Sequence, residues 1–162
     1  MIIITTQCFA PTIGGIESLM TGLAESISST GKDVLVLADR KTDLEEDKNK
    51  KYSIKRFNEW KPIRRRRKAQ YLEKICKEND IEAIFADSWK SIEHLNKEDK
   101  KILVLAHGTE IPKQYWTIMI DKFRFKKNRI IKSYDGVHKI IANSHYTRDL
   151  MLVSLKIDIK KI

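Results

Sequence analysis

The chain has 162 residues, 41% of them hydrophobic, and carries a formal net charge of +10. This length and composition predict one domain, residues 1–162, with a buried core. No apolar run approaches the roughly 20 residues that cross a membrane, and the opening residues lack the basic start and the length of a secretory signal. We therefore expect a cytoplasmic protein.

The cysteines and histidines show no pattern that would hold a metal ion. Cys8 and Cys76 lie far apart in the sequence and form no C-x-x-C motif. The histidines form no H-x-x-x-H motif, and the sequence has no Asp-x-Asp pair. We expect reduced, structural thiols, no metal and no cofactor.

Short apolar runs alternate with helical patterns along the chain. Apolar runs predict strands over 2–6, 34–38, 52–57, 83–86, 102–106 and 139–142. Helical patterns predict helices from Ile16 to a C-cap at Gly31, and over 69–79, 91–99, 116–132 and 146–155, with a polar loop over 41–51. This alternation predicts an α/β fold, a Rossmann-like domain with a mostly parallel sheet and helices on both faces. Ligands of such folds bind beyond the carboxyl ends of the strands.

Gly14 and Gly15 lie between the first predicted strand and the first predicted helix. Glycines there leave backbone N–H groups bare at a helix N-terminus, which suits a phosphate or another anion. The loop before them is longer than in the G-x-G-x-x-G dinucleotide motif, which argues against an NAD site. A glycine pair that only turns the chain into the helix is the alternative.

The excess positive charge is concentrated between Lys48 and Lys68. This segment has 11 basic residues and one acid, Glu59, and the rest of the chain has as many acids as bases. The densest part is Arg64, Arg65, Arg66, Arg67 and Lys68. We expect these five residues to face an anionic partner, such as lipid headgroups, a polyanionic acceptor or nucleic acid. A solvated basic face with no ligand is the alternative.

His107 and Glu110 directly follow the predicted strand over 102–106. A titratable imidazole and a carboxylate thus project beyond a glycine turn, at the edge where this fold binds ligands. We expect a functional role for His107, and a structural histidine is the alternative.

Asn143 and Ser144 follow the last predicted strand, where a helix is expected to begin. Either residue suits the N-cap position. The Ser144 hydroxyl can cap the helix and also face a ligand, so the two roles are compatible.

Four segments stand together at the expected strand ends, namely Phe9–Glu17, Gly31–Val34, His107–Glu110 and Ile140–Arg148. In this order they resemble the N-terminal domain of a GT-B glycosyltransferase, within the retaining family called group 1 or family 4. The resemblance spans nearly the whole chain. It implies an enzyme with two Rossmann-like domains, which bind a nucleotide-sugar between them and a glycan or lipid acceptor mainly against the N-terminal one.

The resemblance also implies roles for individual residues. Gly14 and Gly15 would approach the donor diphosphate, and His107 would line the reaction centre, with Glu110 beside it. The leaving diphosphate would itself take the acceptor proton. The donor-binding half of the family, with its paired-glutamate motif, has no counterpart in this sequence. We therefore expect a fragment or a split subunit that is inactive alone and needs a C-terminal domain in cis or in trans.

Two other functions stay open at this point. One is a non-catalytic subunit that docks the acceptor or the inner face of an anionic membrane for a donor-binding partner. The other is a nucleic-acid-binding module that uses Lys48–Lys68, with Tyr52, Phe57 and Trp60 as stacking residues. The second leaves the motifs at the strand ends unexplained, so nucleic acid is not the partner that we expect.

Overall fold

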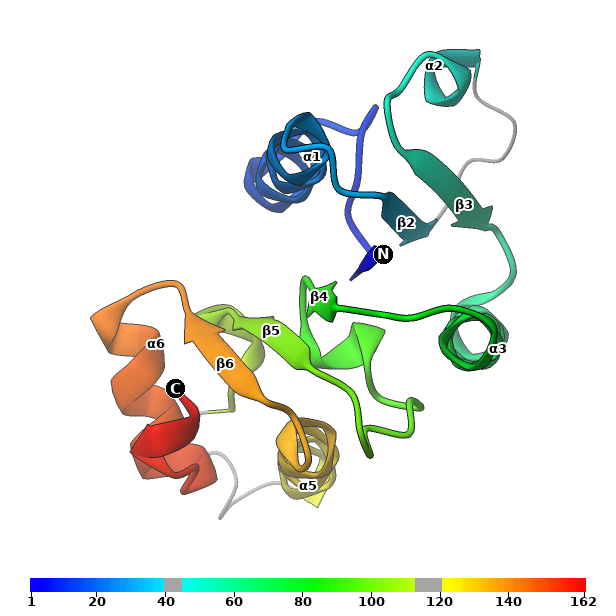
Figure 1. Ribbon diagram of the computed structural model, residues 1–162. Helices are drawn as coiled ribbons and strands as arrows, with labels where there is room; N and C mark the ends of the chain where they lie inside the picture. The colour runs from blue at the N-terminus through cyan, green and yellow to red at the C-terminus, as the bar shows by residue number, and fades with distance from the viewer. Residues whose placement is uncertain (40–44, 113–120) are drawn as a thin grey trace.

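Six parallel strands form one sheet in the order β3-β2-β1-β4-β5-β6 (Figure 1). This computed structural model describes residues 1–39, 45–112 and 121–162, and the side chains of all these except 121–124. The strands are β1 (Ile2–Thr6), β2 (Val34–Asp39), β3 (Ser53–Phe57), β4 (Ala83–Ala86), β5 (Ile102–Ala106) and β6 (Lys139–Ala142). Each predicted strand is present to within one residue, and the Rossmann-like α/β fold is confirmed.

The central strands are buried on both faces, which explains why apolar residues follow one another along most of each strand. Neighbouring residues of a strand point to opposite faces. Ile3 therefore packs in one core cluster with Leu37, and Ile4 packs in a second cluster with Val36. Strand β3, at the edge of the sheet, is instead exposed at alternate residues.

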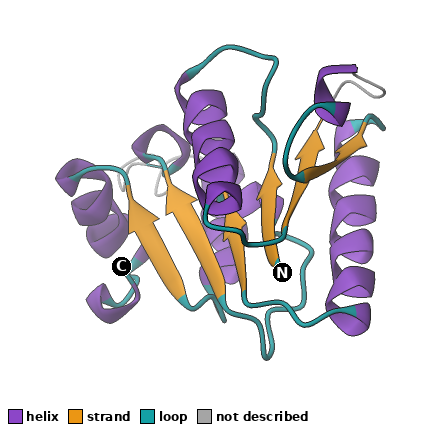
Figure 2. Ribbon diagram, turned by 45° about the horizontal axis from the view of Figure 1, so that its top comes forward, coloured by secondary structure: helices purple, strands orange, loops and turns teal. Residues whose placement is uncertain are grey.

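Helices cover both faces of the sheet, as predicted (Figure 1, Figure 2). The helices are α1 (Gly15–Ser29), α2 (Glu45–Lys48), α3 (Lys61–Glu78), α5 (Asp121–Tyr134) and α6 (His145–Leu150). Met20 of α1 packs in the Ile4 cluster, whereas Leu72 of α3 and Ile130 of α5 pack in the Ile3 cluster. The turns η1 (Trp89–Ser91), η2 (Gly108–Glu110) and η4 (Ile159–Lys161) are 3-10 helices, and η3 (Met151–Leu155) is a π-helical turn that continues α6.

Gly31 ends α1 in the predicted way. Its φ of +82° lies in the left-handed region, which residues with a side chain rarely adopt. This turn directs the chain into β2.

The predicted helix over 91–99 is wrong. Only η1 is helical there, and it ends at Ser91. Beyond it the Asn96 side chain accepts a hydrogen bond from the backbone of Glu98 at 3.2 Å, and Asp99 takes a left-handed φ of +56°. Such local bonding competes with helix formation.

Helix α3 begins eight residues before the predicted start at Ala69. Pro62 suits the first turn of a helix, and arginine has a high helix propensity. The apolar pattern does not mark this part because its buried positions are Arg64 and Lys68. Of the predicted helix over 116–132, residues 116–120 lie outside the described residues, and the remainder is in α5.

Candidate functional site

All six strands point to one edge of the sheet, which we call the carboxyl edge (Figure 2). The strand order places β1 beside β4, so the direction in which the chain winds reverses between these two strands. In open α/β sheets, ligands bind at the carboxyl ends of the strands at this point.

Asp87, the first residue after β4, connects β1 to β4 at this position. Its buried carboxylate accepts hydrogen bonds from Thr6 Oγ1 at 2.9 Å and from Gln7 N at 2.7 Å. The hydroxyls of Ser88 and Ser91 donate to its other oxygen at 3.2 Å and 2.6 Å. Four uncharged donors thus stabilise this buried carboxylate, and no cation among the described residues pairs with it.

His107 follows β5 and contacts the same loop. Its Nε2 lies 2.9 Å from the backbone oxygen of Asp87. Because a carbonyl oxygen only accepts hydrogen bonds, Nε2 must carry a proton, and Nδ1 of the neutral ring is then an acceptor. The imidazole can therefore accept a hydrogen bond from a ligand hydroxyl at Nδ1.

The turn after His107 packs against the start of α6. A Cβ on Gly108 would lie 3.0 Å from Thr147 Oγ1, so this close approach favours glycine. Ser144 Oγ accepts a hydrogen bond from Thr147 N at 3.1 Å, which confirms Ser144 as the N-cap of α6. The structure thus brings His107 and Ser144 to neighbouring loops of the carboxyl edge. A contact between Ser144 and a ligand stays a prediction.

Glu110 lies in η2, where its carboxylate forms an ion pair with Lys90 through Oε1. This pair connects η2 to η1. Its other oxygen, Oε2, is buried and accepts no hydrogen bond from a described residue. The role of Glu110 near a reaction centre stays a prediction.

Gly14 and Gly15 form the start of α1, and no side chain caps it. The first N–H groups of a helix have no partner within the helix. A Cβ on Gly15 would meet no described atom within 4 Å, whereas a Cβ on Gly14 would collide with Glu17 Oε2. Open space therefore surrounds Gly15. The approach of a diphosphate to this pair stays a prediction.

Cys8, in the loop between β1 and α1, does not have the properties of a nucleophile. Burial, together with the carboxylates of Asp87 and Glu17, raises the pKa of its thiol to about 11. The thiol is therefore protonated at neutral pH. Across residues 1–39, 45–112 and 121–162, no three His, Cys, Asp or Glu side chains come together as metal ligands.

Two of the five residues expected to face an anionic partner are buried, which corrects that prediction. Lys68 Nζ donates to Asp39 Oδ1 at 2.7 Å and to Thr6 O at 2.8 Å, with only 1% of the residue exposed. Arg64 Nε lies 2.9 Å from Asp39 Oδ2, and Arg64 is 8% exposed. Residues four apart share one face of a helix, and this face of α3 packs on the ends of β1 and β2.

The other three arginines of α3 leave a smaller basic surface than the sequence predicts. Arg65 pairs with Glu93 at 3.2 Å and Arg67 with Glu59 at 2.7 Å, while Arg66 is exposed.

The stacking residues of the nucleic-acid alternative are also largely unavailable. Tyr52 and Phe57 are buried in the core, and only Trp60 is exposed. In the part of the chain that the structure describes, no helix is long and apolar enough to cross a membrane.

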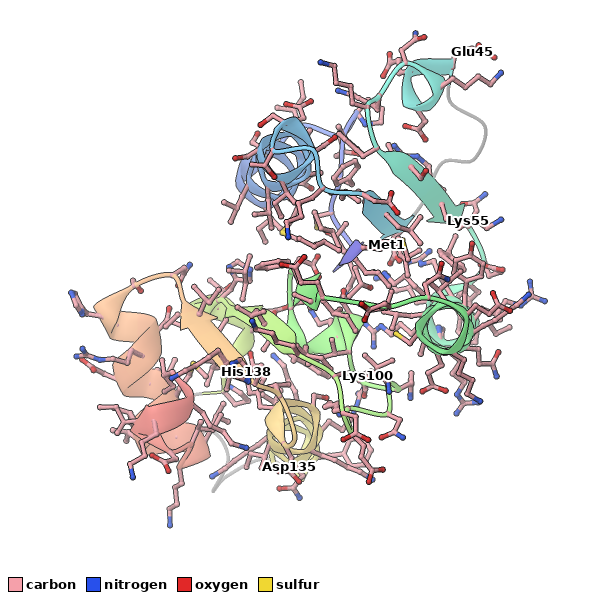
Figure 3. All side chains as sticks on the ribbon, in the orientation of Figure 1. Met1, Glu45, Lys55, Lys100, Asp135 and His138 are labelled. Atoms are coloured by element: carbon pink, nitrogen blue, oxygen red, sulfur yellow. The ribbon has the colours of Figure 1, made fainter. Side chains whose placement is uncertain are left out.

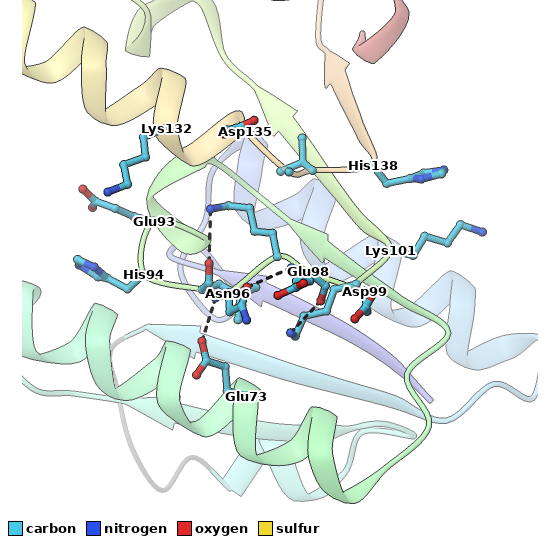
Figure 4. A pocket seen from close by; sticks show the side chains of 15 residues that line it. Glu73, Glu93, His94, Asn96, Glu98, Asp99, Lys101, Lys132, Asp135 and His138 are labelled. Atoms are coloured by element: carbon cyan, nitrogen blue, oxygen red, sulfur yellow. Dashed lines mark hydrogen bonds between the residues drawn. The ribbon is translucent and has the colours of Figure 1, made fainter.

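A wide hollow lies at the opposite edge of the sheet, where β5 and β6 begin. Its wall includes Glu93, Lys101 and His138 (Figure 4). Figure 3 shows His138 just before β6 and Asp135 at the end of α5. This hollow is remote from the strand-end motifs, so we place the site at the carboxyl edge.

Sequence reasoning missed two residues of the carboxyl edge, Asp39 and Asp87. Each stands at or directly after the end of a buried strand, β2 or β4. A carboxylate in that position was the available signal, because the carboxyl ends of parallel strands meet at one edge.

Residues 13–162 match the family described as Glycosyltransferase Family 4. The crystal structure of a glycosyltransferase from Rickettsia africae ESF-5 is similar to this chain, with a TM-score of 0.63 and 18% sequence identity. That similarity shows a shared fold, and it covers 99% of this chain and 41% of that chain. No curated protein matches the sequence. Because the family match includes nearly every residue, from the glycine pair to the C-terminal turns, the chain belongs to glycosyltransferase family 4.

Proposed function

We propose that this domain is the acceptor-side half of a retaining glycosyltransferase, which transfers a sugar from a nucleotide-sugar to a glycan or lipid acceptor. One observation carries the proposal. At the carboxyl edge, Asp87 in the loop after β4 contacts the loop that leads to Gly14 and Gly15, and it also contacts the side chain of His107. This is the position at which an open α/β sheet binds its ligand.

The start of α1 is suited to the diphosphate of the donor. Bare N–H groups and the positive end of the helix dipole both favour an anion. The space beside Gly15 is open, and the flexible side chain of Glu17 can move away from Gly14 as a phosphate approaches.

His107 is suited to orient a hydroxyl of the acceptor or of the transferred sugar through Nδ1. In the proposed reaction, the bond between sugar C1 and the diphosphate oxygen breaks, and a bond from C1 to the acceptor oxygen forms on the same face. The acceptor proton passes to the leaving diphosphate. The domain positions the reacting groups, and it stabilises the charge that develops on the leaving diphosphate.

A second Rossmann-like domain, in cis or in trans, would hold the sugar and the nucleotide. The similar R. africae chain is compatible with this arrangement, because the match covers only 41% of it. The present domain alone would then transfer sugar poorly or not at all. We also propose that the protein acts in the cytoplasm.

The variants His107→Ala and Gly15→Val test the site, in the enzyme that combines this domain with its donor-binding half. We expect His107→Ala to lower kcat about 100-fold and to change the donor KM by less than about threefold. Gly15→Val should raise the donor KM, because its side chain enters the space that the diphosphate needs. Steady-state kinetics measures both effects, and the melting temperature shows whether each variant is folded.

His138→Ala is the matched control, because His138 is exposed at the opposite edge of the sheet. It should leave kcat and KM unchanged. A His107→Ala enzyme that is less stable but turns over normally would remove His107 from the site. Turnover by the present domain alone at the rate of the complete enzyme would refute the two-domain proposal.

A further inference from the structure

A small cavity opens at the carboxyl ends of β1, β2 and β3. Glu17, the third residue of α1, and Lys61, the first residue of α3, both line it, so it lies between the starts of these two helices. Its volume is about 150 Å³. Sites for whole small ligands measure about 300–1,000 Å³, so this cavity has room for a single chemical group.

Charged residues of both signs line the cavity, and cations outnumber acids in the wall by three to two. The charged residues in its wall are Arg56, Lys61, Arg64, Asp39 and Glu17. Directly behind the wall, Lys68 pairs with Asp39, and Asp47 pairs with Arg56. Asp87, which accepts a hydrogen bond from the wall residue Gln7, also lies behind the wall. Over the described residues these are four cations and four acids, and the two helix starts add positive partial charge.

Arg64 is a buried residue of this wall with unused hydrogen-bonding capacity. It is more than nine-tenths buried and shares the Asp39 carboxylate with Lys68. Arg64 Nε lies 2.9 Å from Asp39 Oδ2, but its hydrogen does not point at that oxygen, so it makes no hydrogen bond to a described residue. Nη1 donates to the backbone oxygen of Glu59 at 3.0 Å. A planar guanidinium with free N–H groups matches the oxygens of a carboxylate or phosphate.

We propose that this cavity binds a phosphate or carboxylate group carried by the sugar acceptor. Arg64 holds the group from within, and Lys61, which is exposed at the rim, attracts it. The inference rests on the proposed function, because it requires the acceptor to lie against this domain. With its anionic group bound beside β2 and β3, the acceptor extends toward β1 and β4, where its hydroxyl would react.

Binding of inorganic phosphate to the 162-residue chain, measured by calorimetry at low ionic strength, tests the cavity. The decisive variant is Lys61→Gln, because Lys61 is exposed and lies outside the buried ion cluster. Its matched control is Lys74→Gln, an exposed lysine on the same helix. We expect the phosphate Kd to rise about tenfold in Lys61→Gln and to stay unchanged in Lys74→Gln.

Arg64→Gln should weaken phosphate binding further, while Arg64→Lys, which keeps the charge but loses the fork, should bind at an intermediate level. Melting temperatures identify any Arg64 variant that fails to fold, and Lys61→Gln then decides the result. Equal phosphate affinities in Lys61→Gln, Lys74→Gln and the parent chain would overturn the proposal.

The anionic group is identified by comparing the binding of three probes: a sugar phosphate, a uronic acid and a neutral methyl glycoside. Tighter binding of the sugar phosphate assigns a phosphorylated acceptor, and tighter binding of the uronic acid assigns an acidic sugar. Equal binding of all three would overturn the proposal.

A competition experiment separates the acceptor from the donor. Saturating uridine diphosphate should leave phosphate bound in the cavity, and competition between them would assign the cavity to the donor. Failure of these tests, with normal sugar transfer by the enzyme that combines this domain with its donor-binding half, would refute the acceptor subsite alone. Phosphate binding to the domain without sugar transfer by that complete enzyme would refute the proposed function.

Discussion

The loops after β2 and β3 and the loops after β4 and β5 lie at the same carboxyl edge, but different interactions hold them in place. On the first side, charged groups pair with one another, as in the buried pair of Asp39 with Lys68 and the half-buried pair of Arg56 with Asp47. On the second side, uncharged donors surround the buried Asp87, and His107 contacts a backbone oxygen. The half-buried pair of Lys90 and Glu110 also connects these loops, but it does not contact Asp87.

This difference separates two ways to build a ligand site. Buried ion pairs pay a large desolvation cost, and the loss of one partner leaves an uncompensated charge. When a carboxylate is held by uncharged donors, its loss leaves only neutral groups without a partner, which costs less than a buried charge without a partner. We infer that the β2–β3 side is suited to recognise an anion, and that the β4–β5 side is suited to orient hydroxyl groups.

The largest expected effect comes from Asp39→Ala, which removes the anion that Lys68 and Arg64 share. The Lys68 side chain is only 2% exposed, so its charge would be left buried and uncompensated. We expect the free energy of unfolding to fall by about 3–5 kcal/mol, measured by urea denaturation. Asp149→Ala is the control, because Asp149 pairs with Arg148 at the surface, and it should cost less than about 1 kcal/mol. Similar losses in both variants would show that the buried ion cluster contributes no more to stability than a surface ion pair.

Asp87→Ala should have a smaller effect than Asp39→Ala, although Asp87 accepts more hydrogen bonds. Loss of the Asp87 carboxylate leaves four donors without their acceptor, but no cation of the described residues loses a partner. We expect a loss of about 2 kcal/mol in the same urea experiment. His107 should keep its place, because its partner is the backbone oxygen of residue 87. A loss larger than that of Asp39→Ala would show that uncharged donors hold the edge more strongly than the ion cluster does.

The strands could be predicted from the sequence because each buried strand contains a run of consecutive apolar residues. The motifs after them could be placed as well, since the carboxyl ends of parallel strands share one edge. That reasoning places Gly14, Gly15, His107 and Ser144 at one edge, and the structure confirms this placement.

The ion cluster could not be predicted from sequence patterns. Arg64 and Lys68 occupy the buried face of α3, where hydrophobic periodicity expects apolar residues. Lys68 and Asp39 are 29 positions apart, and Asp87 is 81 positions from Thr6. Such pairings depend on the order of strands in the sheet, which local patterns do not determine. The run of basic residues in α3 was therefore predicted to lie on the surface, although Arg64 and Lys68 are buried.

The smallest expected effect concerns Ser144, which extends the comparison to the loop after β6. Ser144→Ala removes the side-chain acceptor of the Thr147 N–H and should lower the free energy of unfolding by about 1 kcal/mol. Ser144→Asp is the matched variant, because aspartate also caps helices and should restore stability.

In the complete enzyme, turnover separates the two roles of Ser144. If Ser144 only caps α6, Ser144→Asp restores turnover together with stability, whereas restored stability without turnover would show that the hydroxyl also contacts a ligand. A loss below about 0.3 kcal/mol in Ser144→Ala would mean that the cap does not hold this loop, and the comparison would then be confined to β2–β5.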